Sequence, residues 1–312
     1  MFAEGCKATI MRVKVIINPR SGRGRAREQT GLIDKLGHRY GDLDIVPTQR
    51  AGHAIELAAA AAGEGYDMVV AAGGDGTVNE VVNGLVGAGD QASLPMGIIP
   101  IGSGNDLAFG LGIREKPEEA IQRIFTGRPR ASDLGRVIDD RGQSRVFQNN
   151  LGIGFDAIVV MRTETISRIQ GFLMYLTAVF QTIAFYYDTP YMEMTFDDQP
   201  VNQRALFLYA GVGPRGGGGF LMTPDAKWDD NLIDTCLVNP VGRLTMLYML
   251  TRVMKGTHVT SRHVTMRQSR TITAWSSSPM PIYVDGEMFA YPRDNVHQVT
   301  VTSLPAAVQV MV

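Results

Sequence analysis

The sequence is poor in cysteine, in net charge and in long apolar runs, and each shortage excludes a class of protein. Only two of its 312 residues are cysteines, Cys6 and Cys236, so neither a disulfide framework nor a cysteine-ligated zinc site is expected. Thirty basic and thirty-one acidic side chains leave a net charge of −1, which provides no basic field for nucleic acid. We therefore expect no nucleic-acid partner and a reducing, cytoplasmic compartment.

We expect neither an export signal nor a membrane span in this chain. Residues 1–12 carry an early acid and lack the apolar core of a signal peptide. The least charged stretch, 171–187, is interrupted by polar residues and is shorter than the ~20 residues that cross a bilayer. It is more apolar than one buried helical stripe requires. We expect it to pack on the rest of the chain or on a second copy in a homodimer, or to line a lipid groove at a membrane surface.

The first 130 residues alternate between strand and helix patterns. Their length is that of one domain, and the full chain has the length and ordinary composition of two. Alternation of this kind is typical of a parallel sheet covered by helices. The expected strands are 12–18, 67–73 and the apolar run 94–101, and the expected helices are a segment ending near residue 37, then 54–66 and 77–87.

After about residue 131 the pattern changes to short alternating runs separated by turn residues, which is typical of an antiparallel sandwich. Helical stretches near 168–187 and 244–255 interrupt it. The fold class is therefore predicted as α/β, with a nucleotide-binding domain at 12–131 and a β-sandwich domain at 132–295. For the last segment, 296–312, a return to the first domain is left open.

Three glycine-rich turns follow apolar strands: NPRSG at 18–22, GGDGTVNE at 73–80 and PIGSGND at 100–106. In open α/β sheets, ligands bind beyond the carboxyl ends of the strands, where these turns are expected to cluster. Glycine lets backbone N–H groups approach phosphate oxygens, and a helix that begins near Thr77 offers the positive end of its dipole. The turns together predict a nucleotide site.

The common phosphate-binding motifs do not explain these turns. No Gly-Lys dipeptide occurs, so the Walker A loop is absent, and the dinucleotide fingerprint is only approximated at 152–157. In any single turn, Asp75 or Asp106 could simply close the loop through its own side chain. If Asp75 lies beside a polyphosphate, a divalent cation, Mg²⁺, has to bridge the two negative groups.

Taken together, VIINPRSGRGR, AAGGDGTVNEVVNGL, MGIIPIGSGNDLAFGLGI, GGGGFLMTPDAKWDDNLIDTCLV and IYVDGE resemble, in that order, the bacterial diacylglycerol kinase family. These lipid kinases are related to sphingosine and ceramide kinases and more distantly to NAD kinases and phosphofructokinases. The resemblance covers about residues 12–312. It implies an N-terminal nucleotide-binding α/β domain like those of NAD kinases and phosphofructokinases, a C-terminal β-sandwich, and a cleft between them where ATP and lipid meet.

The resemblance also implies roles for individual residues. Asp75 would organise Mg²⁺ and the polyphosphate, Glu287 matches the family's catalytic base, and Asp106 is a second candidate for that base. The residues implied at ATP or at the cleft wall are Asn18, Pro19, Arg20, Ser21, Gly22, Thr48, Gly74, Asp75, Gly76, Thr77, Val78, Asn79, Glu80, Ser103, Asn105 and Asp106.

A second, structural metal site is implied at Asp230, with backbone oxygens of Lys227 and Leu232 as further ligands. The family usually has glycine at the next position, where this chain has Asn231. Asparagine tolerates the left-handed backbone conformation better than other residues except glycine, so we expect the turn to be retained.

We therefore predict an ATP- and Mg²⁺-dependent kinase that phosphorylates the hydroxyl of diacylglycerol or a similar lipid, in peripheral contact with the inner face of the membrane. The glycine run 216–219 is expected either to cover the cleft or to form a plain loop. Two alternatives are an NAD kinase, which shares the GGDGT turn, and a non-catalytic ligand-binding protein with the same fold.

Overall fold

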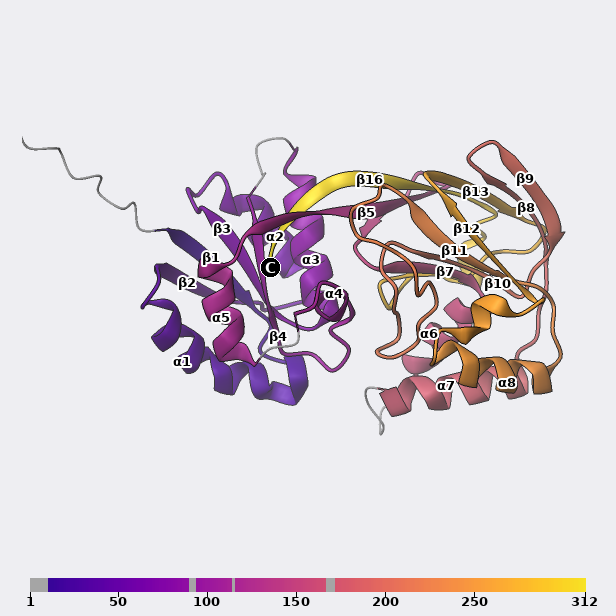
Figure 1. Ribbon diagram of the computed structural model, residues 1–312, viewed down its shortest axis with the longest axis horizontal. Helices are drawn as coiled ribbons and strands as arrows, with labels where there is room; N and C mark the ends of the chain where they lie inside the picture. Colours follow the sequence, from indigo (N-terminus) through magenta and orange to yellow (C-terminus); the bar gives the residue numbers. More distant parts are fainter. Residues whose placement is uncertain (1–10, 90–93, 114–115, 167–171) are drawn as a thin grey trace, which may run out of the picture.

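The computed structural model describes residues 11–89, 94–113, 116–166 and 172–312. It consists of an N-terminal half with a parallel sheet between helices and a C-terminal half built as an antiparallel sandwich (Figure 1). The predicted fold class is confirmed. Cys6 and the predicted helical residues 168–171 lie outside the described residues.

Four parallel strands form the sheet of the N-terminal half, in the order β2-β1-β3-β4. The strands are β1 (Arg12–Ile17), β2 (Asp42–Pro47), β3 (Met68–Gly73) and β4 (Met96–Pro100). The helices are α1 (Arg25–Gly37), α2 (His53–Ala61), α3 (Asp75–Gly87), α4 (Asp106–Gly110) and α5 (Pro117–Thr126).

Strand β3 shows why the sheet is covered on both faces. Its residues are all buried, and alternate side chains belong to different cores. Val69 and Ala71 pack with residues of α2 and α3, whereas Val70 packs with residues of α1 and α5. This follows from the two-residue period of a strand, and it explains the continuous apolar run in the sequence. Strand β2 was not predicted, because as an edge strand it carries two exposed aspartates, Asp42 and Asp44.

Two long strands connect the halves. Strands β5 (Pro129–Asp139) and β16 (Gln298–Met311) pair antiparallel with each other. At one end β16 pairs with β4 through Val310 and Met96, and toward the other end it pairs with β13 (Thr271–Ser276). One sheet of ten described strands therefore runs through both halves (Figure 1). The expected domain boundary at 131/132 lies inside β5.

In the C-terminal half, a second antiparallel sheet, of six described strands, packs against the far end of the ten-stranded sheet. Its order is β12-β11-β10-β7-β14-β15. The remaining strands are β6 (Ser144–Phe147), β7 (Asn150–Gly154), β8 (Tyr191–Phe196), β9 (Gln199–Arg204), β10 (Phe207–Gly211), β11 (Ile233–Val238), β12 (Val264–Ser269), β14 (Ile282–Val284) and β15 (Glu287–Ala290).

Three helices cover the outer face of this second sheet, α6 (Phe155–Thr163), α7 (Phe172–Phe185) and α8 (Arg243–Val253) (Figure 1). Alternate residues of β10 again face different cores, since Leu208 faces the first sheet and Tyr209 faces the helices. Helix α8 and the described part of α7 were predicted, whereas α6 was not. Across the described part of the chain, the helices are too short or too polar to cross a bilayer.

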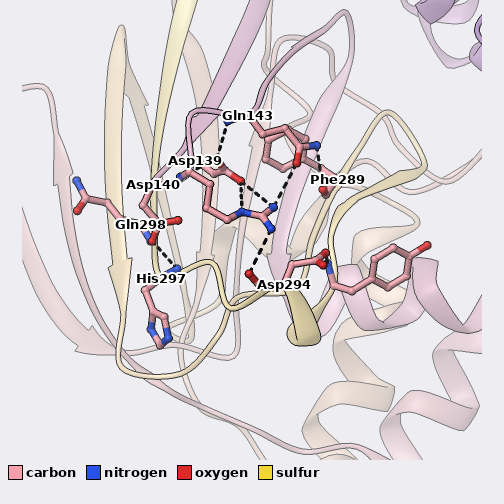
Figure 2. Close-up of polar contacts among 9 residues, drawn as sticks. Asp139, Asp140, Gln143, Phe289, Asp294, His297 and Gln298 are labelled. Carbon is pink, nitrogen blue, oxygen red and sulfur yellow. Dashed lines mark hydrogen bonds and ion pairs between the residues drawn. The ribbon is translucent and has the colours of Figure 1, made fainter.

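The turn between β5 and β6 holds the start of β16 in place (Figure 2). The carboxylate of Asp140 accepts hydrogen bonds from the backbone N–H groups of His297, at 2.9 Å, and Gln298, at 3.1 Å. Asp139 accepts a hydrogen bond from the N–H of Gln143 at 2.8 Å. These contacts define where β16 begins to pair with β5, which aligns Val299 with Asp139.

Candidate functional site

The three glycine-rich turns meet at the carboxyl edge of the parallel sheet. A Cβ atom on Gly102 in the third turn would lie 2.4 Å from the Cα atom of Gly74 in the second turn. In the first turn, Gly22 has φ +59°, and a Cβ there would lie 2.4 Å from the carbonyl oxygen of Ile101. Glycine is therefore required at these contacts, because any side chain would push the turns apart.

A cavity of about 810 Å³, here called the polar cavity, opens between the first two turns. Helix α3 begins at its wall, and the first N–H groups of a helix have no acceptor within the helix and carry its positive dipole end. The predicted residues that line it are Asn18, Pro19, Arg20, Ser21, Thr48, Gly74, Gly76, Thr77, Glu80 and Glu287. Such a wall suits a negatively charged ligand.

The polar cavity also has residues that sequence reasoning missed. They are Gly24, Gln49, Arg50 and Ala51. The last three follow the unpredicted strand β2, so recognising a strand at 42–47 would have identified them, because ligand sites lie beyond strand ends.

Four residues that were predicted to lie at ATP or at the cleft wall do not line the polar cavity. Val78 is 4% exposed and packs in the core. The side-chain amide of Asn79 donates to the carboxylate of Asp285 at 2.7 Å, and that of Asn105 donates to the carbonyl of Gly102 at 3.0 Å. Gly22 lies against Ile101, as described above. These residues shape the turns and do not line the polar cavity.

Glu80 lines the polar cavity, but both of its carboxylate oxygens already have partners. They accept hydrogen bonds from the backbone N–H groups of Gly52, at 2.9 Å, and Ala54, at 3.0 Å. These donors belong to the start of α2, where free N–H groups need acceptors. Glu80 therefore joins α3 to α2 and shapes the wall of the cavity.

Beyond the second turn lies another cavity, of about 230 Å³, here called the acidic cavity. It is lined by Asp75, Ser103, Gly104, Asp106, Gln148, Asn149, Asn150, Val160, Thr163, Met174, Tyr175, Gly217, Gly218, Tyr283, Asp285 and Gly286. Successive residues of the second turn face the two cavities, since Gly74 and Gly76 line the polar cavity and Asp75 lines the acidic cavity.

Asp75 has the surroundings of a metal-binding carboxylate. Burial, and then the nearby charge of Asp106, raise its pKa to about 6. Oδ1 accepts the N–H of Asp106 at 2.6 Å. Oδ2 lies beside Gly104, where a Cβ would come within 2.6 Å of it. A glycine there leaves this oxygen room for a cation, so a divalent ion fits Asp75.

Asp106, by contrast, has both carboxylate oxygens engaged. Oδ1 lies 2.6 Å from the guanidinium Nε of Arg215, and Oδ2 accepts the N–H of Gly218 at 3.0 Å. Arg215 also donates to the carbonyl of Gly104 at 2.8 Å. Both partners belong to the connection that contains the glycine run 216–219, so this run packs against the third turn. Asp106 is thus placed to hold the two halves together, and each of its oxygens already has a partner.

Glu287, the first residue of β15, is the exposed carboxylate of the site. A Cβ on Gly76 would lie 3.6 Å from its Oε1, so it lies beside the start of α3. Its Oε2 is 3.6 Å from Nη1 of Arg145, and its side chain is 60% exposed. Glu287 lines the polar cavity and its neighbour Gly286 lines the acidic cavity. The carboxylate therefore lies near the boundary between the two cavities.

Asp285 does not share a strand face with Glu287, as it would if the strand continued through Gly286. The chain turns at Asp285, with φ +47°, and at Gly286, with φ +86°. The carboxylate of Asp285 accepts the N–H groups of Gln148, Asn149 and Asn150 at 2.8 to 3.0 Å. With the bond from Asn79, these contacts fix the turn that presents Glu287.

The residues implied in a second metal site lie in one turn. Oδ1 of Asp230 accepts the N–H of Leu232 at 3.1 Å. Asn231 has φ +59°, which is the left-handed conformation that we expected of it. Among the described residues, no group of three or more His, Cys, Asp or Glu side chains is placed to hold a metal. A site built from Asp230 and the backbone oxygens of Lys227 and Leu232 stays a prediction.

A third cavity, here called the apolar cavity, lies between the second sheet and helices α6, α7 and α8, and it measures about 90 Å³. Tyr175 and Tyr283 line both this cavity and the acidic cavity, so the two adjoin. Helix α7 lines the apolar cavity with Val179 and Ile183. The three cavities thus form a sequence from the glycine turns to the helices of the C-terminal half.

Two family models match the chain. The model of the diacylglycerol kinase catalytic domain matches residues 12–137. The model described as the YegS C-terminal NAD kinase beta sandwich-like domain matches residues 149–312.

Known relatives match over most of their length. The diacylglycerol kinase of Mycobacterium tuberculosis strain H37Rv is 30% identical over 304 residues, which are 97% of this chain and 95% of that protein. A protein of Chromohalobacter salexigens described as a YegS-like lipid kinase is 31% identical over 275 residues, 88% of this chain and 86% of that protein. A crystal structure provisionally titled as a diacylglycerol kinase of Bacillus anthracis strain Sterne has the same fold, with a TM-score of 0.78, 22% identity and 98% of each chain covered.

Proposed function

Since the chain belongs to the diacylglycerol kinase family of lipid kinases, we propose that it transfers the γ-phosphoryl group of ATP to the hydroxyl of diacylglycerol or a closely similar lipid. The observation that carries this proposal is that, in two turns, neighbouring residues line different cavities. Asp75 and Gly76 face different cavities, and so do Gly286 and Glu287. The nucleotide would occupy the polar cavity and the acceptor hydroxyl the acidic cavity, so that they meet at these residues.

The polar cavity supports the nucleotide part of the proposal. Backbone N–H groups at the start of α3 would bind phosphate oxygens, and Arg20 and Arg27 would add positive charge. The carboxylate of Asp75 would hold Mg²⁺, and a bound Mg²⁺ would offset charge on the transferring phosphoryl group.

Glu287 would act as the general base. The lipid hydroxyl gives its proton to the carboxylate as its oxygen attacks the γ-phosphorus. A phosphorus–oxygen bond to the lipid forms, the bond to the β–γ bridging oxygen breaks, and ADP leaves. Asp106 is proposed for a different task, since its pairing with Arg215 and Gly218 joins the third turn to the C-terminal half.

The apolar cavity and the outer faces of α7 and α8 support a lipid substrate. At about 90 Å³ the cavity is smaller than the roughly 150 Å³ that holds one benzene molecule, so it would take only the part of an acyl chain next to the headgroup, and the rest of the chain would remain in the membrane. Large apolar side chains on the two helices face solvent: Leu173, Phe180, Phe185, Leu244 and Tyr248 are 48 to 84% exposed. We propose that this surface makes the peripheral contact with the inner face of the membrane.

A kinase assay with competing acceptors tests the proposal. The full chain is incubated with Mg²⁺ and γ-labelled ATP, and with either diacylglycerol in mixed micelles or NAD. We expect label in phosphatidic acid, loss of labelling when EDTA removes the metal, and loss of labelling in Asp75→Asn. Label only in NADP would reject the lipid in favour of an NAD kinase, and no label with either acceptor would favour a binding protein.

A further inference from the structure

A row of residues crosses the second sheet on the face that carries the apolar cavity. In the strand register Tyr209 of β10 lies opposite Gly152 of β7, which in turn lies opposite Tyr283 of β14. Gly152 leaves room for its neighbours, because a Cβ there would come within 2.2 Å of the Tyr283 ring and 2.8 Å of Oδ2 of Asp156. Asp156 in the first turn of α6 therefore lies above the row, and Tyr209, Tyr283 and Asp156 bring polar atoms into a mostly apolar cavity.

Two of the three tyrosine hydroxyls around Asp156 have a partner. Tyr175 donates to Oδ1 of Asp156 at 2.9 Å, and Tyr283 donates to Oδ2 at 2.7 Å. Tyr209 is 1% exposed, and within the part of the chain that the structure describes its hydroxyl has no hydrogen-bond partner. A buried hydroxyl without a partner costs folding free energy, so its presence calls for an explanation.

The hydroxyl of Tyr209 lies where the acidic cavity passes into the apolar cavity. A Cβ on Gly216 would lie 2.8 Å from the Tyr209 hydroxyl oxygen and 3.0 Å from Nδ2 of Asn150. Gly216 lines the apolar cavity, whereas Asn150 lines the acidic cavity. Suppose that the hydroxyl of a lipid reacts in the acidic cavity and that its chain leaves through the apolar cavity. The group that links the chain to the alcohol would then lie beside the hydroxyl of Tyr209.

We infer that Tyr209 donates a hydrogen bond to the carbonyl oxygen that links the acyl chain to the alcohol of the substrate. This inference rests on the proposed function and makes it narrower. The enzyme would select lipid alcohols with an acyl linkage next to the reacting hydroxyl, against ether-linked lipids and polyprenols, which lack that carbonyl. The selectivity follows because a site with a buried donor binds poorly to a ligand that leaves the donor unpaired.

A second polar atom of the apolar cavity lacks a partner among the described residues, Nδ1 of His258. Nε2 of this ring lies 3.0 Å from the carbonyl oxygen of Met222, which only accepts hydrogen bonds, so Nε2 carries the proton. Nδ1 is then an acceptor and cannot bind a carbonyl. Tyr209 is therefore the residue that we assign to the acyl linkage.

The test compares two acceptors of equal chain length in mixed micelles, dioctanoylglycerol and its dialkyl ether analogue, by ADP release. We expect the wild-type protein to prefer the ester about 2- to 10-fold, which is the worth of one net hydrogen bond. Tyr209→Phe should bring this ratio close to one. Gly216→Ala, whose methyl group would crowd the hydroxyl, should lower it too. Tyr191→Phe on β8, outside all three cavities, should keep the wild-type ratio.

Thermal unfolding of each variant separates selectivity from folding, and the Tyr209→Phe midpoint should not fall. The inference is overturned if Tyr209→Phe keeps the ester preference, if the wild type shows none, or if the variant loses both rates with unchanged unfolding. The proposed function is a separate outcome, since its failure would appear as no ADP release by the wild type with either lipid.

Discussion

Five carboxylates line the polar and acidic cavities, and their neighbours give each a different task. Glu80 accepts two backbone N–H groups at the start of α2. Asp106 is paired with Arg215, and Asp285 accepts backbone N–H groups at a turn. Asp75 is partly buried, has a raised pKa and lies beside Gly104, which leaves space next to its carboxylate. Glu287 is exposed beside the start of α3. The assignment of Glu287 as the base therefore rests on its availability, because the other four acids already accept hydrogen bonds or suit a metal.

Replacement of Glu287 should affect turnover and leave ATP binding largely intact. In Glu287→Gln the neutral amide cannot accept the hydroxyl proton, so we expect kcat to fall by about 10² to 10⁴ with little change in KM for ATP. The measurement is ADP release with diacylglycerol micelles. Glu118→Gln, an exposed glutamate on α5, is the matched control and should behave as wild type. Full turnover in Glu287→Gln would show that another group takes the proton.

Asp285 should make the stability of the protein depend on pH. Burial raises its pKa from 3.8 to about 6. Between these pH values the folded chain holds a proton that the unfolded chain has released. The free energy of unfolding should therefore fall as pH rises through this window, by roughly 1 to 3 kcal/mol from this group.

Urea unfolding of wild type and Asp285→Asn at several pH values between about 4 and 7 measures this contribution. Asp234, whose pKa is also raised to about 6, remains in both proteins, so its contribution cancels in the comparison. Asp75 remains too, but the charge of Asp285 helps to raise its pKa, so removing that charge makes the decline in the variant shallower still. The variant should show a shallower decline of stability with pH. Equal slopes would mean that Asp285 titrates normally in the folded state.

At the scale of elements, α7 and α8 each have one face at the apolar cavity and another face that is exposed to solvent. Val179 and Ile183 of α7 and Met246 and Met249 of α8 line the apolar cavity. The other faces of the same helices carry exposed apolar side chains, of which Leu244 is 84% exposed. This arrangement explains why 171–187 is more apolar than a helix with one buried stripe. It leaves an apolar surface next to the cavity that the substrate would enter.

Polar substitutions on this surface should weaken binding to membranes. A fully buried Leu or Phe side chain contributes roughly 1.5 to 3 kcal/mol, so Leu244→Gln and Phe185→Gln should each lower vesicle affinity on the order of tenfold. The measurement is co-sedimentation with phosphatidylglycerol-containing vesicles, with Ile138→Gln on β5 as an exposed apolar control. Unchanged binding of both variants would show that the membrane contacts another surface.

At the scale of the whole molecule, β5 and β16 make the two halves one folding unit. Both strands run through the ten-stranded sheet, and the last residues of the chain complete the sheet of the N-terminal half. Trp228 adds a contact between the halves, since a Cβ on Gly110 of α4 would lie 2.5 Å from its ring. The Asp106–Arg215 pair adds another.

Equilibrium unfolding should therefore be a single transition. In Trp275→Phe, Trp228 remains as the sole tryptophan, and its fluorescence reports on the contact between the halves. We expect the same urea midpoint from this fluorescence and from far-UV circular dichroism, as in two-state unfolding. Two separated transitions would show that each half is stable without the shared strands.

Much of the fold and of the candidate site can be predicted from the sequence, because it depends on residues that are neighbours in the chain. The glycine turns, the β3 run and helices α1, α3 and α8 follow from local periodicity and turn chemistry, and the motifs pointed to Asp75 and Glu287. The pairing of Asp106 with Arg215, the return of β16 to β4, and the row formed by Tyr209, Gly152 and Tyr283 join segments separated by about sixty to two hundred residues. No local pattern encodes such contacts, since they arise only when sheets and helices pack and decide which polar groups find partners. For that reason only the tertiary structure shows that Asp106 links the two halves and that the hydroxyl of Tyr209 has no partner among the described residues.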